Sequence, residues 1–400
     1  MSVQDVPTRT PETVRPPIFT RAYVTMCVLS FGGMASCYLL MSTLPLFAAR
    51  HGGGGFGAGL TTGTMMLATI LLEPVTPRLA SRYGYRLTLT AGLLLMGVPA
   101  LLPLTSSALP VVLLACALRG AGLGIMVVAG TALIAETVAP ERRSEALGVY
   151  GIAVGVPALS CLPLGIWLSE HTGFRVLFVA AAVVAVVPLA VAGGLPGVRG
   201  ASEGEAGEDE PAEHGGLLAA ALRPELARPA IIFAAITFTT GVLQTFLPLA
   251  VHGATAGLVA GSLFAQSLAT AVTRWLSGRF ADRYGARPLL VPMVLLTTAG
   301  AATLVWTGNP VAVILGPGLF GAGFGIAQTA TLALMLGRVT RPEFGRVSAL
   351  WNIAYDGGMG VGAVGFGIVV SVASYAGGFA ITAGLLALTI VPVWLDRRTR

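Results

Sequence analysis

The sequence predicts an all-α polytopic membrane protein made of two similar halves. Hydrophobic residues are 55% of its 400 residues and charged residues only 10%, and continuous apolar runs recur along the chain. Two motifs are also repeated at one offset of 201 residues. PRLASRYGYR begins at Pro77 and returns as GRFADRYGAR at Gly278, while LRGAGLGI begins at Leu118 and returns as LFGAGFGI at Leu319. A common offset for two separate motifs indicates a duplicated half.

Twelve apolar segments are expected to be membrane-spanning helices. At about 1.5 Å rise per residue, each is long enough to cross a hydrocarbon core of roughly 30 Å. Their approximate ranges are 22–49, 57–79, 87–105, 109–136, 146–168, 173–195, 229–250, 256–281, 288–307, 310–337, 344–371 and 374–395.

These segments divide the chain into an N-terminal six-helix bundle at 21–195 and a C-terminal six-helix bundle at 229–395. The linker between them, 196–228, is acidic and rich in glycine and has no apolar face, which predicts a flexible cytoplasmic connection. Residues 1–20 and 396–400 are expected to be cytoplasmic tails.

The arginines predict the orientation. With the N-terminus inside, 21 of the 24 arginines lie on the cytoplasmic side and only Arg50 and Arg175 lie outside. Positive charge concentrates in cytoplasmic loops, so both termini are expected in the cytoplasm. Every basic residue is arginine and glycine is abundant, with 53 residues, which is typical of a GC-rich bacterial genome. The expected location is therefore a bacterial inner membrane.

The repeated basic turn resembles the loop signature of the major facilitator superfamily of secondary transporters. In the C-terminal copy the matching residues are Gly278, Asp282, Arg283, Gly285 and Arg287. In the N-terminal copy Arg82, Gly84 and Arg86 match, whereas Pro77 and Ser81 replace the glycine and the aspartate. The resemblance implies two six-helix bundles related by a pseudo-two-fold axis, with a cavity between them that opens alternately to each side. It extends to twelve-helix drug/proton antiporters, although the segment 151–165 matches their helix-5 element only in part.

Three ionisable residues inside spans are candidates for proton coupling, because a charge in hydrocarbon is costly and is retained for a reason. Arg119 opens an R-G-A-G-L-G run that resembles the helix-4 motif of proton-coupled exporters; its alternative role is hydrogen bonding within the N-terminal bundle. Asp356 lies midway along the eleventh span among glycines. We expect it to be a carboxylate that binds a proton or a cation; its alternative role is a hydrogen bond between helices. Glu73 precedes Pro74 and either serves coupling or pairs with Arg78 or Arg82.

A weakly polar substrate cavity is expected, mainly in the second half. Neutral polar side chains inside spans need partners and therefore tend to face the interior of a bundle. Each of them could equally join two helices. The candidates are Gln244, Gln266, Gln328 and Asn352, together with the aromatic residues Trp351, Tyr355 and Phe246.

The basic turns are expected to form a cytoplasmic gate. Asp282 should approach the start of the fifth span, where the helix dipole favours an anion, and close this side. Ser81 has no charge at the equivalent position, so the latch should be asymmetric. Glu136 is expected to form a salt bridge at the membrane surface.

No enzyme, metal site or cofactor is expected. The chain has no G-x-x-x-x-G-K-S/T motif, and its four cysteines fall singly in apolar runs, where they are expected to be packing residues. The protein is expected to interact with a small-molecule substrate, protons and membrane lipids, but not with nucleic acid. It is expected to be a monomer.

The preferred function is proton-coupled efflux of a small amphiphilic organic compound by alternating access. The alternatives are a proton-coupled uptake symporter for a sugar, organic acid or amino-acid-like metabolite, and a non-transporting membrane sensor or lipid-moving protein.

Overall fold

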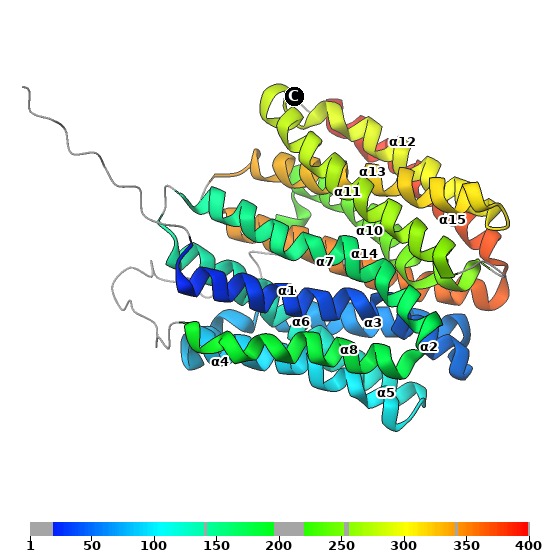
Figure 1. Ribbon diagram of the computed structural model, residues 1–400. Coiled ribbons are helices and arrows are strands. Elements are labelled where there is room, and N and C mark those ends of the chain that lie inside the picture. The colour runs from blue at the N-terminus through cyan, green and yellow to red at the C-terminus, as the bar shows by residue number, and fades with distance from the viewer. Residues whose placement is uncertain (1–18, 140–141, 196–219, 252–255, 341–342, 399–400) are drawn as a thin grey trace, which may run out of the picture.

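The computed structural model describes residues 19–139, 142–195, 220–251, 256–340 and 343–398. Within these ranges the structure is almost entirely helical and has no strands, and the long helices lie side by side (Figure 1). The N-terminal helices fill the lower part of Figure 1 and the C-terminal helices the upper part. Most of the predicted tails and linker lies outside the described residues.

The N-terminal bundle consists of α1 (Arg21–Met41), α2 (Thr43–Ala48), η1 (Ala49–Gly53), α3 (Gly54–Leu72), α4 (Thr76–Gly97), η2 (Val98–Leu101), α5 (Leu102–Thr105), α6 (Leu109–Thr137), α7 (Arg143–His171), α8 (Phe174–Val186) and η4 (Val187–Gly194). The C-terminal bundle consists of α10 (Pro224–Ala250), α11 (Ala256–Tyr284), η5 (Arg287–Leu289), α12 (Leu290–Thr303), η6 (Leu304–Trp306), α13 (Pro310–Leu336), α14 (Phe344–Val372), α15 (Tyr375–Leu388) and α16 (Ile390–Arg398).

These elements form the predicted twelve spans. Ten described helical stretches are long and apolar enough to cross a membrane, and one of them, Arg21–Leu72, holds two spans because the chain reverses between α2 and α3. The more polar α11 is the remaining span. An even number of spans brings the start of α1 and the end of α16 to one face, here called the terminal face, at the left of Figure 1. The other side is called the opposite face.

Proline and glycine divide the helices where the sequence predicts it. The helix of the second span is interrupted at residues 73–75, at Pro74, since proline removes a backbone donor. Gly84 then reverses the chain within α4, with φ 78° and ψ 158°, and Gly285 does so after α11, with φ 81°. Residues with a Cβ atom rarely adopt this backbone conformation. One boundary differs from expectation: α10 begins at Pro224, inside the predicted linker, because proline suits the first turn of a helix.

The duplication is visible in individual hydrogen bonds. Thr69 donates its hydroxyl to the carbonyl oxygens of Met65 and Gly120, each at 3.0 Å. At the equivalent position of the second half, Thr270 donates to the carbonyls of Gln266 and Gly321 at 2.8 and 3.0 Å. The second span therefore packs on the fourth as the eighth packs on the tenth.

The two bundles meet along two helix pairs, α3 with α14 and α7 with α11. At the opposite face, a Cβ atom on Gly55 would lie 2.6 Å from the side chain of Val370, and one on Gly59 would lie 3.0 Å from the carbonyl carbon of Ala363, so α3 and α14 are in close contact. Nearer the terminal face the contact is looser, and a Cβ atom on Gly357 would lie 3.9 Å from Ile70. Thr62 and Thr245 also share a hydrogen bond of 2.8 Å across the two halves.

Candidate functional site

Two carboxyl groups from different halves lie near each other between the bundles. Asp356 on α14 is only 8% exposed, and Glu73 follows the last residue of α3, at the break before Pro74. The two groups are close enough to interact electrostatically. Among the described residues, neither carboxyl group has a hydrogen-bond or ion-pair partner, so the predicted pairing of Glu73 with Arg78 or Arg82 is not present. Arg82 lies over the ring of Tyr83 instead, at 5.4 Å.

Glycines on α14 explain how a carboxyl group reaches this depth between packed helices. A Cβ atom on Gly358 would lie 2.5 Å from the carbonyl oxygen of Ala234, and Gly362 contacts the backbone at Phe238. Both contacts are with α10, so α14 lies directly on its neighbour there. Small residues allow two helices to approach this closely.

Arg274 on α11 is a functional candidate, although by its place in the sequence it is only one of the arginines expected on the cytoplasmic side. Its side chain is exposed and extends to α13, where Nη1 donates to Oε1 of Gln328 at 3.4 Å. A Cβ atom on Gly151 of α7 would lie 3.8 Å from its Nη2 atom. The guanidinium also interacts electrostatically with Tyr38 on α1 and Tyr355 on α14. It therefore lies between the halves, and the signal that could have revealed it is a charge about ten residues from the end of a span.

Aromatic side chains line the α14 side of this region. Trp351 stacks on Phe233 with ring centroids 4.5 Å apart, and Tyr355 lies 6.0 Å from Trp351. Trp351 and Tyr355 are half-buried. The Trp351 Nε1 atom donates to the hydroxyl of Thr331 at 3.0 Å. Two of the three predicted aromatic residues are thus brought together near Asp356.

The other predicted cavity residues are dispersed. Gln244 is 8% and Gln266 is 3% exposed, and within the described part of the chain their Oε1 atoms have no hydrogen-bond partner. Phe246 is completely buried against Phe366, at 4.8 Å, on the side where the halves are closed. Asn352 is half-buried on α14. Only Gln328 directly contacts a charged group of the central region.

Arg119 forms its hydrogen bonds inside the N-terminal bundle. Its side chain is fully buried, and Nη1 and Nη2 donate to the hydroxyl and carbonyl of Ser36 at 3.2 and 2.8 Å. Nη1 also donates to the carbonyl of Met96. The side chain of α6 thereby joins α1 to α4, which corresponds to the alternative role considered for it. The repeat-equivalent residue, Phe320, is also fully buried.

Comparison with protein-family models gives a match to the Major Facilitator Superfamily over residues 26–335 and 230–400. The chain belongs to this superfamily. Members of this superfamily are multi-pass secondary transporters of small molecules and not enzymes.

Curated facilitator relatives match only part of the chain. An uncharacterized MFS-type transporter of Bacillus subtilis, YddS, is 27% identical over 156 residues, which are 38% of this chain and 35% of the relative. A probable vesicular acetylcholine transporter of Danio rerio is 30% identical over 127 residues, 32% of this chain and 25% of the relative. The matched region thus spans about a third or less of these relatives' own length.

Solved facilitator structures match over nearly the whole chain. A bacterial homolog of the human lysosomal transporter Spinster has a TM-score of 0.76 at 13% identity, covering 96% of this chain and 98% of that one. The nucleoside transporter NupG has a TM-score of 0.72 at 13% identity, with 95% and 100% covered. At these identities the likeness shows the fold.

The signature turns of this facilitator do not form the expected latch. Asp282 lines a groove of its own half with Gly285, Arg287 and Arg338, and no hydrogen bond or ion pair among the described residues links it to α7. Ser81 donates to the carbonyl of Arg78 at 3.0 Å, within its own helix. The halves are held together at the opposite face, which leaves the predicted latch unformed.

The remaining gate residues lie on the surface near the terminal face. Glu136 accepts a hydrogen bond from the hydroxyl of Tyr85, and no ion pair of the described residues includes it. Arg283 lies over the ring of Tyr284 at 5.3 Å. Arg86 approaches Gly193, whose Cβ atom would be 3.8 Å from Nη2, and Gly278 has open space at its Cβ position.

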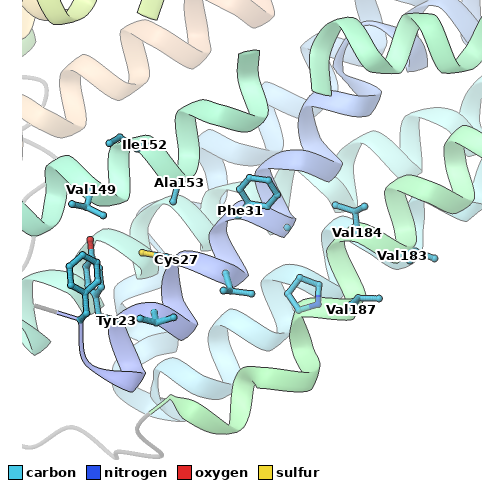
Figure 2. Close-up of a pocket in the computed structure, with 14 residues that line it drawn as sticks. Tyr23, Cys27, Phe31, Val149, Ile152, Ala153, Val183, Val184 and Val187 are labelled. Atoms are coloured by element: carbon cyan, nitrogen blue, oxygen red, sulfur yellow. The ribbon is translucent and has the colours of Figure 1, made fainter. Parts of the chain in front are cut away.

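A separate groove of about 650 Å³ lies on the outer side of the facilitator's N-terminal bundle (Figure 2). Its walls come from α1, α7, α8 and η4, and valines predominate in its lining. Val28, Ile152 and Val187, which border it, are 41%, 64% and 62% exposed. Such a surface suits hydrocarbon chains, and it differs from the central region, where charged and aromatic groups meet.

The four cysteines are free thiols; Cys37, Cys116 and Cys161 are buried, and Cys27 is half-buried. This agrees with their expected packing role.

Proposed function

We propose that this facilitator exports a small amphiphilic organic compound in exchange for protons, with the carboxyl groups of Glu73 and Asp356 as the proton-binding pair. The observation that carries the proposal is their position: they come from different halves, are close enough to interact electrostatically, and have no cationic partner among the described residues. Two nearby carboxylates repel each other, and a proton bound to either relieves the repulsion.

The location of the pair gives a route for coupling. Glu73 belongs to the α3 side and Asp356 to α14, so a rocking motion of the halves changes the distance between the two groups. Proton binding then differs between the two states, and this difference in binding free energy is what lets a proton bias a conformational equilibrium. Arg119, with three hydrogen bonds inside one bundle, is proposed to stabilise that bundle.

The export direction is supported by the partial resemblance to drug/proton antiporters and by the few polar groups of the central region. With the terminal face in the cytoplasm, the contact at the opposite face closes the outer side. The central region is then open to the cytoplasm in this conformation, a state that alternating access visits in both directions of transport. The relatives' names cover different compounds and do not select a substrate.

The test measures proton flux in proteoliposomes that contain the full chain, with a screen of lipophilic cations, organic anions and neutral metabolites. A compound that drives proton movement opposite to its own, with loss of coupling in Asp356→Asn and in Glu73→Gln, is the expected result. Glu170→Gln is the control, because Glu170 pairs with Arg50 at 2.7 Å near the opposite face.

Other outcomes select the alternatives. Movement of compound and protons in the same direction would replace export by uptake. Coupling that survives in both carboxyl variants would remove Glu73 and Asp356 from the mechanism. Lipid movement without solute transport would favour a lipid-moving protein.

A further inference from the structure

Arg274 is the charged group between the halves whose position the proton mechanism does not explain. Its guanidinium carries a permanent positive charge, lies inside a span and is exposed. Among the described residues, its side chain donates one long hydrogen bond, of 3.4 Å to Gln328, and takes part in no ion pair. An ionisable residue inside a membrane span is uncommon, and by default it indicates a functional site that faces the interior or a water-filled cavity.

The fold itself does not require this arginine. Residue 73, at the equivalent position of the first half, is a glutamate, so the duplicated helix accommodates the opposite charge. Arg119 shows what a structural arginine looks like in the same chain, since both of its terminal nitrogens donate to α1 and α4. The terminal nitrogens of Arg274 have no comparable set of acceptors.

The groups beside Arg274 are suited to an anion. Tyr38 and Tyr355 are half-buried, interact electrostatically with the guanidinium, and within the described residues their hydroxyls have no hydrogen-bond partner. The Gln328 amide, whose Oε1 accepts from Nη1 of Arg274, also carries an NH₂ group that can donate to an anion. The fork of a guanidinium matches the two oxygens of a carboxylate, and hydroxyl and amide donors complete such a site. In Arg274 the only competing acceptor among the described residues is the Gln328 oxygen, at 3.4 Å from Nη1.

The adjacent surface is aromatic. Trp351 and Tyr355 are half-buried on α14, with ring centroids 6.0 Å apart, and Trp351 stacks on the fully buried Phe233 of α10 at 4.5 Å. Aromatic faces provide a large contact area for a flat apolar body.

We propose that the transported compound is an amphiphilic organic anion. Its carboxylate-like group binds Arg274, with Tyr38, Tyr355 and Gln328 as further donors, and its apolar body packs on Trp351 and Tyr355. This inference rests on the proposed transport function of the same region and specifies its substrate class. Arg274 acts here as a binding residue, while Glu73 and Asp356 handle the proton.

An alternative role for Arg274 is an ion pair with Glu73 or Asp356 in another conformation. In this structure no such pair is present among the described residues, and Asp356 interacts electrostatically with Glu73. The two roles differ in a measurable way: an ion-pair role affects all substrates alike, whereas a binding role affects the preference for charge.

The experiment compares three probes with the same phenylalkyl body and different head groups: 4-phenylbutyrate, 4-phenylbutanamide and 3-phenylpropyl-trimethylammonium. Binding to the purified full chain in detergent is measured by isothermal titration calorimetry and by the shift in melting temperature. We expect wild type to bind the carboxylate at least about tenfold more tightly than the amide, and the ammonium more weakly than either. Arg274→Gln should remove the preference, and Arg274→Lys should restore part of it.

The matched control is Arg279→Gln on the same helix. Arg279 lies over the ring of Trp275, at 4.0 Å, and is exposed, so its variant should bind like wild type. A carboxylate preference that persists in Arg274→Gln would overturn the proposal. So would a wild type that prefers the ammonium or the amide, or that binds none of the three probes.

Binding does not depend on proton coupling, so the two proposals fail separately. If Asp356→Asn retains coupled transport while the preference for carboxylate depends on Arg274, the proton assignment is wrong and the substrate class stands. If coupling is lost in Asp356→Asn but Arg274→Gln has no effect on charge preference, the reverse is true.

Discussion

Two arginines in the apolar part of the chain have contrasting surroundings. Arg119 is fully buried and donates to Ser36 and Met96, whereas Arg274 is exposed between the halves with a single long hydrogen bond to Gln328. The two residues are of the same type, and both lie in apolar segments. They differ in the hydrogen-bond acceptors within reach of the guanidinium, and these acceptors come from helices that are distant in the sequence.

Replacing Arg119 should therefore reduce stability. In Arg119→Ala the carbonyls of Ser36 and Met96 lose their donor, and a buried acceptor without a partner costs about 1–3 kcal/mol. We expect a lower melting temperature in detergent, with proton coupling retained in the molecules that fold. Arg279→Ala, at an exposed position, should melt like wild type. Normal stability combined with lost coupling in Arg119→Ala would instead assign Arg119 to the proton pathway.

At the scale of elements, the turns after the second and eighth spans depend on one backbone conformation. Gly84 has φ 78° and ψ 158°, in a region that is essentially restricted to glycine and costs other residues about 1–3 kcal/mol. Gly84→Ala and Gly285→Ala should both lower the melting temperature. Gly148→Ala should be neutral or stabilising, because Gly148 lies in helix α7 with open space at its Cβ position. Equal melting temperatures for all three variants would contradict this assignment.

Sequence alone predicted most of these elements. Continuous apolar runs predicted the twelve spans, and the motifs that recur at Pro77 and Gly278 predicted the duplication. Both signals can be recognised in the sequence without knowing which helices are in contact. The proximity of Glu73 to Asp356 and the position of Arg274 between the halves were not predicted. They depend on how α3 faces α14 and α11 faces α7, and such contacts between halves leave no periodic signal in the chain. The latch at Asp282 was expected from a motif, but its formation depends on the conformation that is present.

At the scale of the whole molecule, the contact of α3 with α14 determines which face is closed. A Cβ atom on Gly59 would lie 3.0 Å from the carbonyl carbon of Ala363 and even closer to its oxygen, so these backbones meet directly across the two halves. Packed backbones leave no room for a side chain unless the helices separate. The glycines at the opposite-face end of α3 are therefore what permits closure on this side.

Gly59→Val should shift the population toward conformations in which the opposite face is open. Spin labels at Phe56 and Val372, both exposed near this contact, report the distance between the halves in a background with the four cysteines replaced by alanine. We expect a longer-distance population that wild type lacks, because the added side chain selects against the closed state. Gly384→Val is the control, since Gly384 is exposed in α15 with nothing within 4 Å of its Cβ position. A Gly59→Val protein that folds and keeps the wild-type distance distribution would show that the α3–α14 contact does not control closure, and the rocking motion invoked for Glu73 and Asp356 would then need a different interface.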